Sequence, residues 1–89
     1  MGTFHSDKGE LHGITIVVST DDDRTYVGRC WEENDREVVL LDVDVHEPTD
    51  DLSRIDYLER AKKFGIWKKH PKVVLPRPNV TTLCRLVEA

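Results

Sequence analysis

The sequence predicts a mainly β fold: a small, five-stranded, strongly bent antiparallel barrel with one helix inserted between its third and fourth strands. Three observations predict it, namely short runs of β-branched residues, polar turns between them, and one stretch with helical spacing. The 89 residues have room for one hydrophobic core. We expect a single barrel domain over residues 11–89, preceded by a flexible N-terminal arm over residues 1–10, which has no hydrophobic period.

The first two strands form the opening hairpin of the predicted barrel. Residues 14–19 are β-branched almost throughout, which is typical of a strand. The aspartates at residues 21–23 supply a turn, because their side chains bond to nearby backbone groups. Residues 25–31 form the second strand, with Gly28 at its centre. A glycine inside a strand marks a bend or a close backbone approach, so Gly28 predicts where the sheet curls.

A polar turn at residues 32–36 leads into a third strand over residues 37–46. Its first half is apolar on both faces and its second half on one face only. One face is expected to carry Val39, Leu41, Val43 and Val45, and the other Val38, Leu40, Asp42, Asp44 and His46. Neighbouring residues on one strand seldom complete a metal coordination shell. We therefore expect a water-facing strand edge there and no metal site.

One helix is predicted after the third strand. Ser53 is a suitable N-cap with Asp56 three positions later, and Gly65 is suitably placed to end the helix. Glu59 and Lys63 are spaced to form an ion pair. The narrow apolar stripe consists of Ile55, Leu58 and Ala61. Such a stripe indicates a surface helix that leans on the barrel or on a neighbouring copy.

Two further strands complete the predicted barrel. Residues 73–75 form a short fourth strand, and residues 80–87 form a fifth strand of alternating pattern. The sequence Pro-Arg-Pro-Asn at residues 76–79 predicts a tight turn between them, because proline presets a turn dihedral and asparagine tolerates unusual ones.

Composition excludes several classes of function. The longest apolar runs, such as residues 38–41, are too short for a membrane span or a signal peptide, so we expect a soluble cytoplasmic protein with no membrane partner. Cys30 and Cys84 lack metal or redox spacing and are expected to be free thiols. No serine or cysteine has the context of a nucleophile, and there is no glycine-rich phosphate loop. We expect neither enzymatic activity nor a cofactor.

Charge is divided unevenly along the chain. Residues 1–56 contain 15 acidic and 5 basic residues, a net charge of −10, whereas residues 57–89 contain 2 acidic and 8 basic residues, a net charge of +6. This asymmetry favours head-to-tail contacts between copies. It is equally compatible with a local basic patch that binds an anionic ligand.

Two segments carry a family resemblance. An apolar strand at residues 16–18 is followed by apolar residues alternating around Gly28, and Asp35 lies seven residues after that glycine. Residues 75–80 form a shorter second segment, in which Pro78 stands where glycine is usual. The two segments resemble the first and second Sm motifs of the Sm-like (LSm) family and cover about half of the chain. The resemblance implies a ring of identical copies, closed by pairing between fourth and fifth strands.

The resemblance carries over poorly to the family's RNA pocket. Members that bind uridine-rich RNA stack a base on an aromatic residue or histidine, read it with an asparagine and cover it with the turn arginine. The matching positions here hold Asn34, Val38 and Arg77, so only the arginine is kept. Loss of a stacking residue weakens such a site by about 1–3 kcal/mol per base. The residues we expect to contact single-stranded RNA are Asn34, Asp35, Arg77, Asn79, Lys62, Lys63, Lys68 and Lys69.

The basic stretch over residues 60–72 interleaves lysines with Phe64 and Trp67, a composition typical of a patch for nucleic acid or for an acidic partner. The simpler interpretation is favoured, in which both aromatic side chains anchor a solvated helix to the barrel. We therefore expect a non-enzymatic Sm-like protein that forms a homo-oligomeric ring and binds RNA or RNA-associated partners. The alternative is a structural or protein–protein interaction ring without a working RNA pocket.

Overall fold

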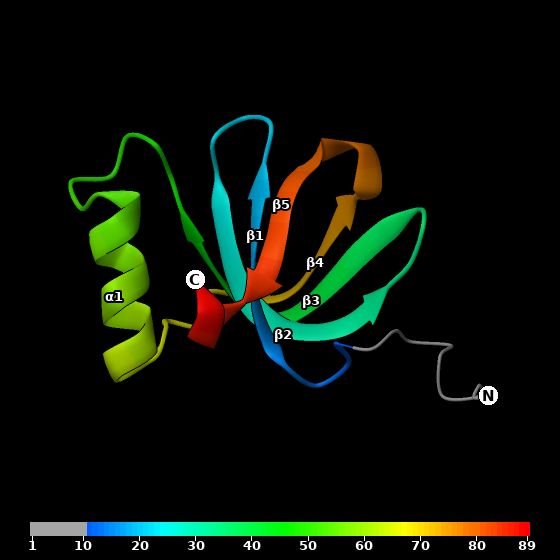
Figure 1. The fold of residues 1–89 in the computed structure, drawn as a ribbon, viewed down its shortest axis with the longest axis horizontal. Coiled ribbons are helices and arrows are strands. Elements are labelled where there is room, and N and C mark those ends of the chain that lie inside the picture. The colour runs from blue at the N-terminus through cyan, green and yellow to red at the C-terminus, as the bar shows by residue number, and fades with distance from the viewer. Residues whose placement is uncertain (1–10) are drawn as a thin grey trace.

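The structure, a computed structural model, describes residues 11–89, so the predicted arm at residues 1–10 lies outside the described part of the chain. Its elements follow one another in the predicted order (Figure 1). They are β1 (Thr15–Thr20), β2 (Thr25–Glu33), β3 (Glu37–His46), α1 (Arg54–Phe64), β4 (His70–Pro76) and β5 (Val80–Arg85), with short 3₁₀ turns at Arg77–Asn79 and Leu86–Glu88. The mainly β prediction with one helix between the third and fourth strands is confirmed.

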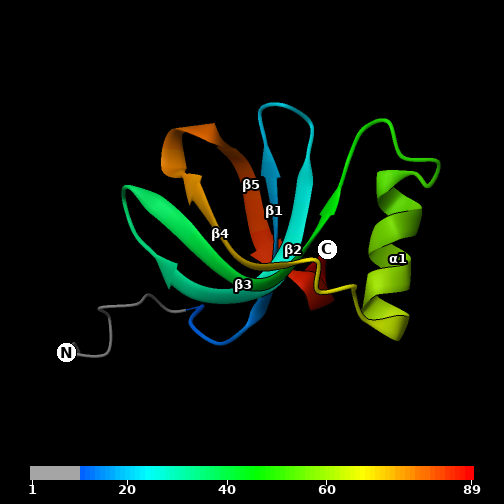
Figure 2. The same cartoon turned by 180° about the vertical axis from the view of Figure 1, so that it is seen from behind.

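The strands form one antiparallel five-stranded sheet in the order β4-β3-β2-β1-β5. The sheet is strongly bent, as both views show (Figures 1 and 2). It is not closed into a barrel, because β4 pairs with β3 and β5 pairs with β1, and these two strands form opposite edges. The predicted closure of the barrel within one chain is therefore not observed.

Gly28 lies at a close approach between β2 and β3. A Cβ atom at this position would lie 3.0 Å from Cγ2 of Val43 and 3.1 Å from the carbonyl oxygen of Leu41. The pairing between the two strands shifts register at this point, and Asp42 on β3 takes a φ of 54°. The predicted close backbone approach at Gly28 is confirmed, and the bulge opposite it lies where the ribbon bends.

The bulge also changes which side chains of β3 share a face. Val43 packs in the same buried cluster as Val38 and Leu40, and Val45 packs against it. The predicted separation of these residues onto opposite faces is wrong beyond Asp42, since the extra residue inverts the alternation. The complete buried cluster consists of Ile16, Val18, Cys30, Val38, Leu40, Val43 and Leu75.

The helix packs on the other face of the sheet. It lies beside the C-terminal 3₁₀ turn (Figure 1). Leu58 of α1 packs with Val17 and Val27, and Leu86 of that turn packs against them. Leu58 and Ala61 are buried as predicted, but Ile55 is 73% exposed, so the predicted apolar stripe is wrong at its first position. Tyr57 of the same helix also packs against this cluster.

Both ends of α1 are capped as the sequence predicts. The Oγ of Ser53 accepts a hydrogen bond of 3.1 Å from the backbone N–H of Asp56. At the other end, the N–H of Gly65 donates to the carbonyl of Ala61 at 3.0 Å, with Gly65 at a φ of 86°. A glycine adopts this left-handed conformation without the strain that a Cβ imposes. The chain therefore turns sharply at Gly65.

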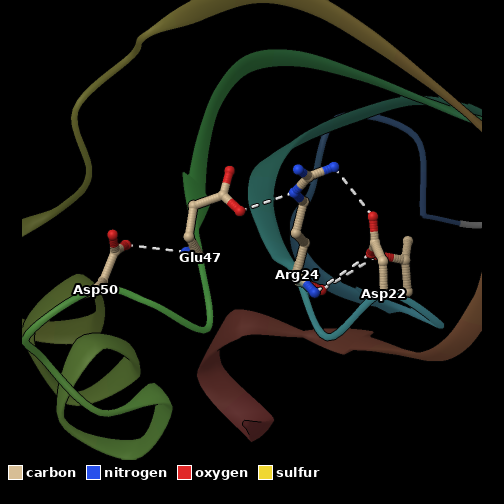
Figure 3. A network of polar contacts seen from close by, with 5 residues as sticks. Asp22, Arg24, Glu47 and Asp50 are labelled. Carbon is tan, nitrogen blue, oxygen red and sulfur yellow. Dashed lines mark hydrogen bonds and ion pairs between the residues drawn. The ribbon is translucent and has the colours of Figure 1, made fainter.

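Arg24 ties the β1–β2 turn to the loop that follows β3 (Figure 3). Its Nε donates to Glu47 at 2.8 Å and its Nη1 to Asp22 at 3.0 Å. The backbone N–H of Glu47 in turn donates to Asp50 at 2.9 Å. The bond to Glu47 raises the pKa of Arg24, and a bond from Thr20 lowers the pKa of Asp22. These exposed ion pairs order the loop and are worth little in stability.

Both cysteines are free, as predicted. Burial, with the nearby charge of Glu33, raises the pKa of Cys30 to about 11. Only thiolates react readily, so we expect Cys30 to react with a thiol reagent at pH 8 at least about a hundredfold more slowly in the native protein than after unfolding. Replacement by Cys30→Ser should leave native labelling, which then reports Cys84, unchanged. A drop in native labelling in that variant would contradict the burial of this thiol.

Candidate functional site

The structure brings together the two turns that the family resemblance singles out. We call Asn34, Asp35, Arg77 and Asn79 the turn surface. The backbone N–H of Arg77 donates to the carbonyl of Arg36 at 2.8 Å, which joins the β2–β3 turn to the 3₁₀ turn between β4 and β5. The predicted residues from the two Sm-like segments therefore lie on adjoining turns.

Two side chains of the turn surface, those of Asn34 and Arg77, already have partners within the chain. The Oδ1 of Asn34 accepts from the N–H groups of Arg36 and Glu37 at 2.8 and 3.0 Å, and its Nδ2 donates to Glu32 at 2.9 Å. The guanidinium of Arg77 lies 3.5 Å from the carboxylate of Glu33. Val38, which matches the family's base-reading position, is buried in the core. The two residues at the family's stacking and covering positions, Asn34 and Arg77, are therefore already engaged within the chain.

A second surface lies where α1 ends. We call Arg60, Lys63, Phe64, Trp67 and Lys68 the helix-end surface. Phe64 is 80% exposed and Trp67 is 76% exposed. The prediction that these two aromatic side chains anchor the helix to the sheet is therefore wrong.

Ile66 explains why the two aromatic residues remain outside. Its side chain, which lies between them in sequence, packs with Leu58 against the sheet. Because Gly65 redirects the chain, only one residue of the connection reaches the core beneath α1. The larger neighbours on either side of Ile66 are left in solvent.

Three residues of the helix-end surface, Arg60, Phe64 and Trp67, line a hollow of about 290 Å³. The hollow lies between α1 and the segment that follows it. Its lining is mainly apolar and consists of Leu52, Tyr57, Ala61, Phe64, Gly65, Ile66 and Trp67, with Arg60 and Asp44 as charged members. Small-molecule sites have volumes of about 300 to 1,000 Å³, so this hollow has room for a single ring system.

The lysines over residues 62–69 divide into paired and unpaired cations. Lys62 forms an ion pair with Glu59 at 3.5 Å, in place of the predicted pair between Glu59 and Lys63. Lys69 lies 3.4 Å from Asp44. Lys63 and Lys68 are exposed and form no ion pair within residues 11–89. These two unpaired cations stand next to Phe64 and Trp67 in the sequence.

Asp44 is the buried centre of a polar cluster beneath the hollow. Only 3% exposed, it accepts a hydrogen bond of 2.9 Å from the hydroxyl of Tyr57 and one of 3.0 Å from the N–H of Val45. Burial, followed by the bond to Asp44, raises the pKa of Tyr57 well above its ordinary value. His46 stacks on the ring of Tyr57 with 4.9 Å between ring centroids. Together with Lys69, this cluster holds the segment after α1 against β3.

The predicted water-facing edge formed by Asp42, Asp44 and His46 is thus wrong for Asp44 and His46, which are buried. Asp42 stands at the bulge, half-exposed, with its carboxylate 3.2 Å from Arg29. The described residues contain no group of three His, Cys, Asp or Glu side chains arranged to hold a metal ion. The one signal in the sequence that could have indicated this cluster is Tyr57 in the predicted helix, which follows the acidic residue Asp44 of the preceding strand.

Comparison of the sequence with protein-family models and with curated proteins finds no match to either. The Sm-like assignment therefore rests on the two short segments and remains a prediction. None of the helices in the described part of the chain is long and apolar enough to cross a membrane.

Proposed function

We propose that this chain is a non-enzymatic Sm-like protein whose copies join into a homo-oligomeric ring that binds single-stranded RNA. The observation that carries the proposal is the strand order, which leaves β4 and β5 as the two edges of one strongly bent sheet. Sheet edges present unpaired N–H and C=O groups, and a neighbouring strand can satisfy them. Pairing β4 of one copy with β5 of the next repeats the same contact, and a ring of copies leaves no edge open.

Assembly through the edges predicts a specific effect of charge on β4. Val74 lies on this strand and is 46% exposed. Val74→Lys should convert the ring into smaller species, since a lysine on an edge strand opposes strand pairing. Val87→Lys is the matched control, because Val87 is 81% exposed and lies outside the strands. Native mass spectrometry measures both variants, and a wild-type protein that stays monomeric at high concentration contradicts the ring.

The helix-end surface supports RNA binding better than the turn surface does. It combines exposed aromatic rings with cations that have no partner in the described chain, whereas Arg77 lies beside Glu33. Residues 59–72 contain six basic residues and one acidic residue, although the whole chain has a net charge of −4. Phosphate contacts by such a patch do not require a basic protein, provided that the acidic side chains lie elsewhere.

A binding titration tests this part of the proposal. We expect a fluorescently labelled, unstructured RNA to bind at low salt, with an affinity that falls as salt is raised, at a logarithmic slope of roughly −0.7 for each phosphate contact. Lys68→Gln should reduce that slope by about this amount, and Arg77→Gln should change it much less. No binding at low salt removes RNA as the ligand.

One observation favours the alternative of a ring that serves protein interactions only. On the turn surface, which matches the family's RNA site, the side chains of Asn34 and Arg77 are engaged by contacts within this chain. This alternative is supported if a ring forms at the expected mass but binds no RNA in the titration. The purified ring should then show no absorbance at 260 nm beyond that of the protein itself.

A further inference from the structure

We infer that the hollow beside the end of α1 is a stacking site for one unpaired base of single-stranded RNA, with the flanking phosphates held by Lys63 and Lys68. This inference rests on the proposed RNA binding and assigns it a place away from the turn surface. It is carried by the exposure of Phe64 and Trp67, by the volume of the hollow that both line, and by three unpaired cations, of which Arg60 lines the hollow and Lys63 and Lys68 adjoin Phe64 and Trp67 in the sequence.

The aromatic residues are placed to receive a flat ring. Phe64 and Trp67 both line the hollow and both remain more than three-quarters exposed. Large aromatic side chains are usually buried to a much greater extent, because their transfer from water is strongly favourable. A base stacked on them would cover this surface, and stacking tolerates any of the four bases because each has a π face.

The basic side chains in and next to the hollow match a phosphate backbone. Arg60 lines the hollow, and Lys63 is on the last turn of α1 next to Phe64. Lys68 follows Trp67 directly and lines a neighbouring hollow with Ile66. None of the three forms an ion pair with another described residue. An anionic ligand therefore displaces no carboxylate, and it gains the interaction with each cation in full.

The acidic group that lines the hollow does not oppose this ligand. Asp44 is almost completely buried and is already bonded to the hydroxyl of Tyr57 and paired with Lys69. Its negative charge is thus balanced within the protein. These contacts also join α1 and the segment carrying Trp67 to β3, so the stacking residues are held in place before a ligand arrives.

Trp67→Ala and Phe64→Ala test the site. Each should weaken the binding of an unstructured RNA roughly 5- to 150-fold, the loss that follows removal of a stacking aromatic residue. Trp67→Phe should retain most of the affinity, because the ring is kept. Ile55→Ala is the matched control, since Ile55 is 73% exposed on the same helix but at its other end. A duplex of the same sequence should bind much more weakly than the single strand, because its bases are already paired.

The result separates this inference from the proposed function. If the wild-type protein binds RNA and neither alanine variant weakens it beyond the Ile55→Ala control, the stacking site is wrong while RNA binding stands. If the wild-type protein binds no RNA, the proposed function itself fails. If Trp67→Ala instead lowers the native mass of the assembly, the hollow is filled by a second copy and the inference is overturned.

Discussion

Gly28→Val is expected to lower the free energy of unfolding by about 2–3 kcal/mol, a large share of the stability of a domain this small. The first added carbon would lie 3.0 Å from Cγ2 of Val43 and 3.1 Å from the carbonyl of Leu41. The backbone carbonyl cannot move without disturbing the pairing of β2 with β3. The substitution therefore strains the bend of the sheet itself.

Urea unfolding followed by circular dichroism measures this effect. Arg29→Ala is the control, because Arg29 is the next residue along β2 and loses only an exposed ion pair with Asp42. We expect it to cost less than about 1 kcal/mol. Gly28→Ala, which adds only the first carbon, provides a milder variant should Gly28→Val fail to fold. Equal stability of Gly28→Ala and wild type would contradict the close approach.

Tyr57→Phe is expected to lower the free energy of unfolding at pH 7 by about 1.5–3 kcal/mol, the usual contribution of a hydrogen bond to a charged group. The substitution keeps the ring and its stacking with His46. It removes the 2.9 Å bond to the buried carboxylate of Asp44. Asp44 then keeps only the N–H of Val45 and the ammonium of Lys69 as partners.

The effect of Tyr57→Phe depends on pH in a defined direction. Folding raises the pKa of Tyr57, mainly through burial. The unfolded chain therefore ionises first, and this contribution to stability is complete below about pH 10 and is lost as the pH rises further. The difference between wild type and Tyr57→Phe should accordingly shrink above pH 10. Because folding also raises the pKa of Cys30, the protein loses further stability above about pH 9, but this loss is equal in wild type and Tyr57→Phe.

A double-mutant cycle identifies the partner of Tyr57. Tyr57→Phe should destabilise an Asp44→Asn background less than it destabilises wild type, because the charged acceptor is gone. Equal losses in the two backgrounds would show that the stability of Tyr57 comes from packing alone.

Local sequence signals predicted the elements well. The bounds predicted for the third strand agree with β3, and the N-cap at Ser53 and the helix end at Gly65 appear as expected. These features depend on residues a few positions apart, so their cause is visible in the sequence. The predicted fourth strand was too short, because β4 begins at His70 and includes prolines that an edge strand tolerates.

The candidate site was predicted only in part. The lysines and aromatic residues of the helix-end surface were recognised from composition, but Phe64 and Trp67 were placed in the core. Their exposure depends on Ile66, which takes the space beneath α1 instead. Phe64, Ile66 and Trp67 could each fill the space beneath α1, and the direction of the chain after Gly65 decides which of them does. A periodic pattern in the sequence does not contain that direction.

By itself, the sequence determined the order and type of the elements, the hairpin turns, the bend at Gly28 and the separation of acidic from basic halves. Only the tertiary structure decided which face each residue of β3 takes after Asp42, because the bulge arises from pairing with β2. It also decided the burial of Asp44, whose partners Tyr57 and Lys69 lie far along the chain. Contacts between distant residues depend on packing, whereas turns and strands depend on neighbours.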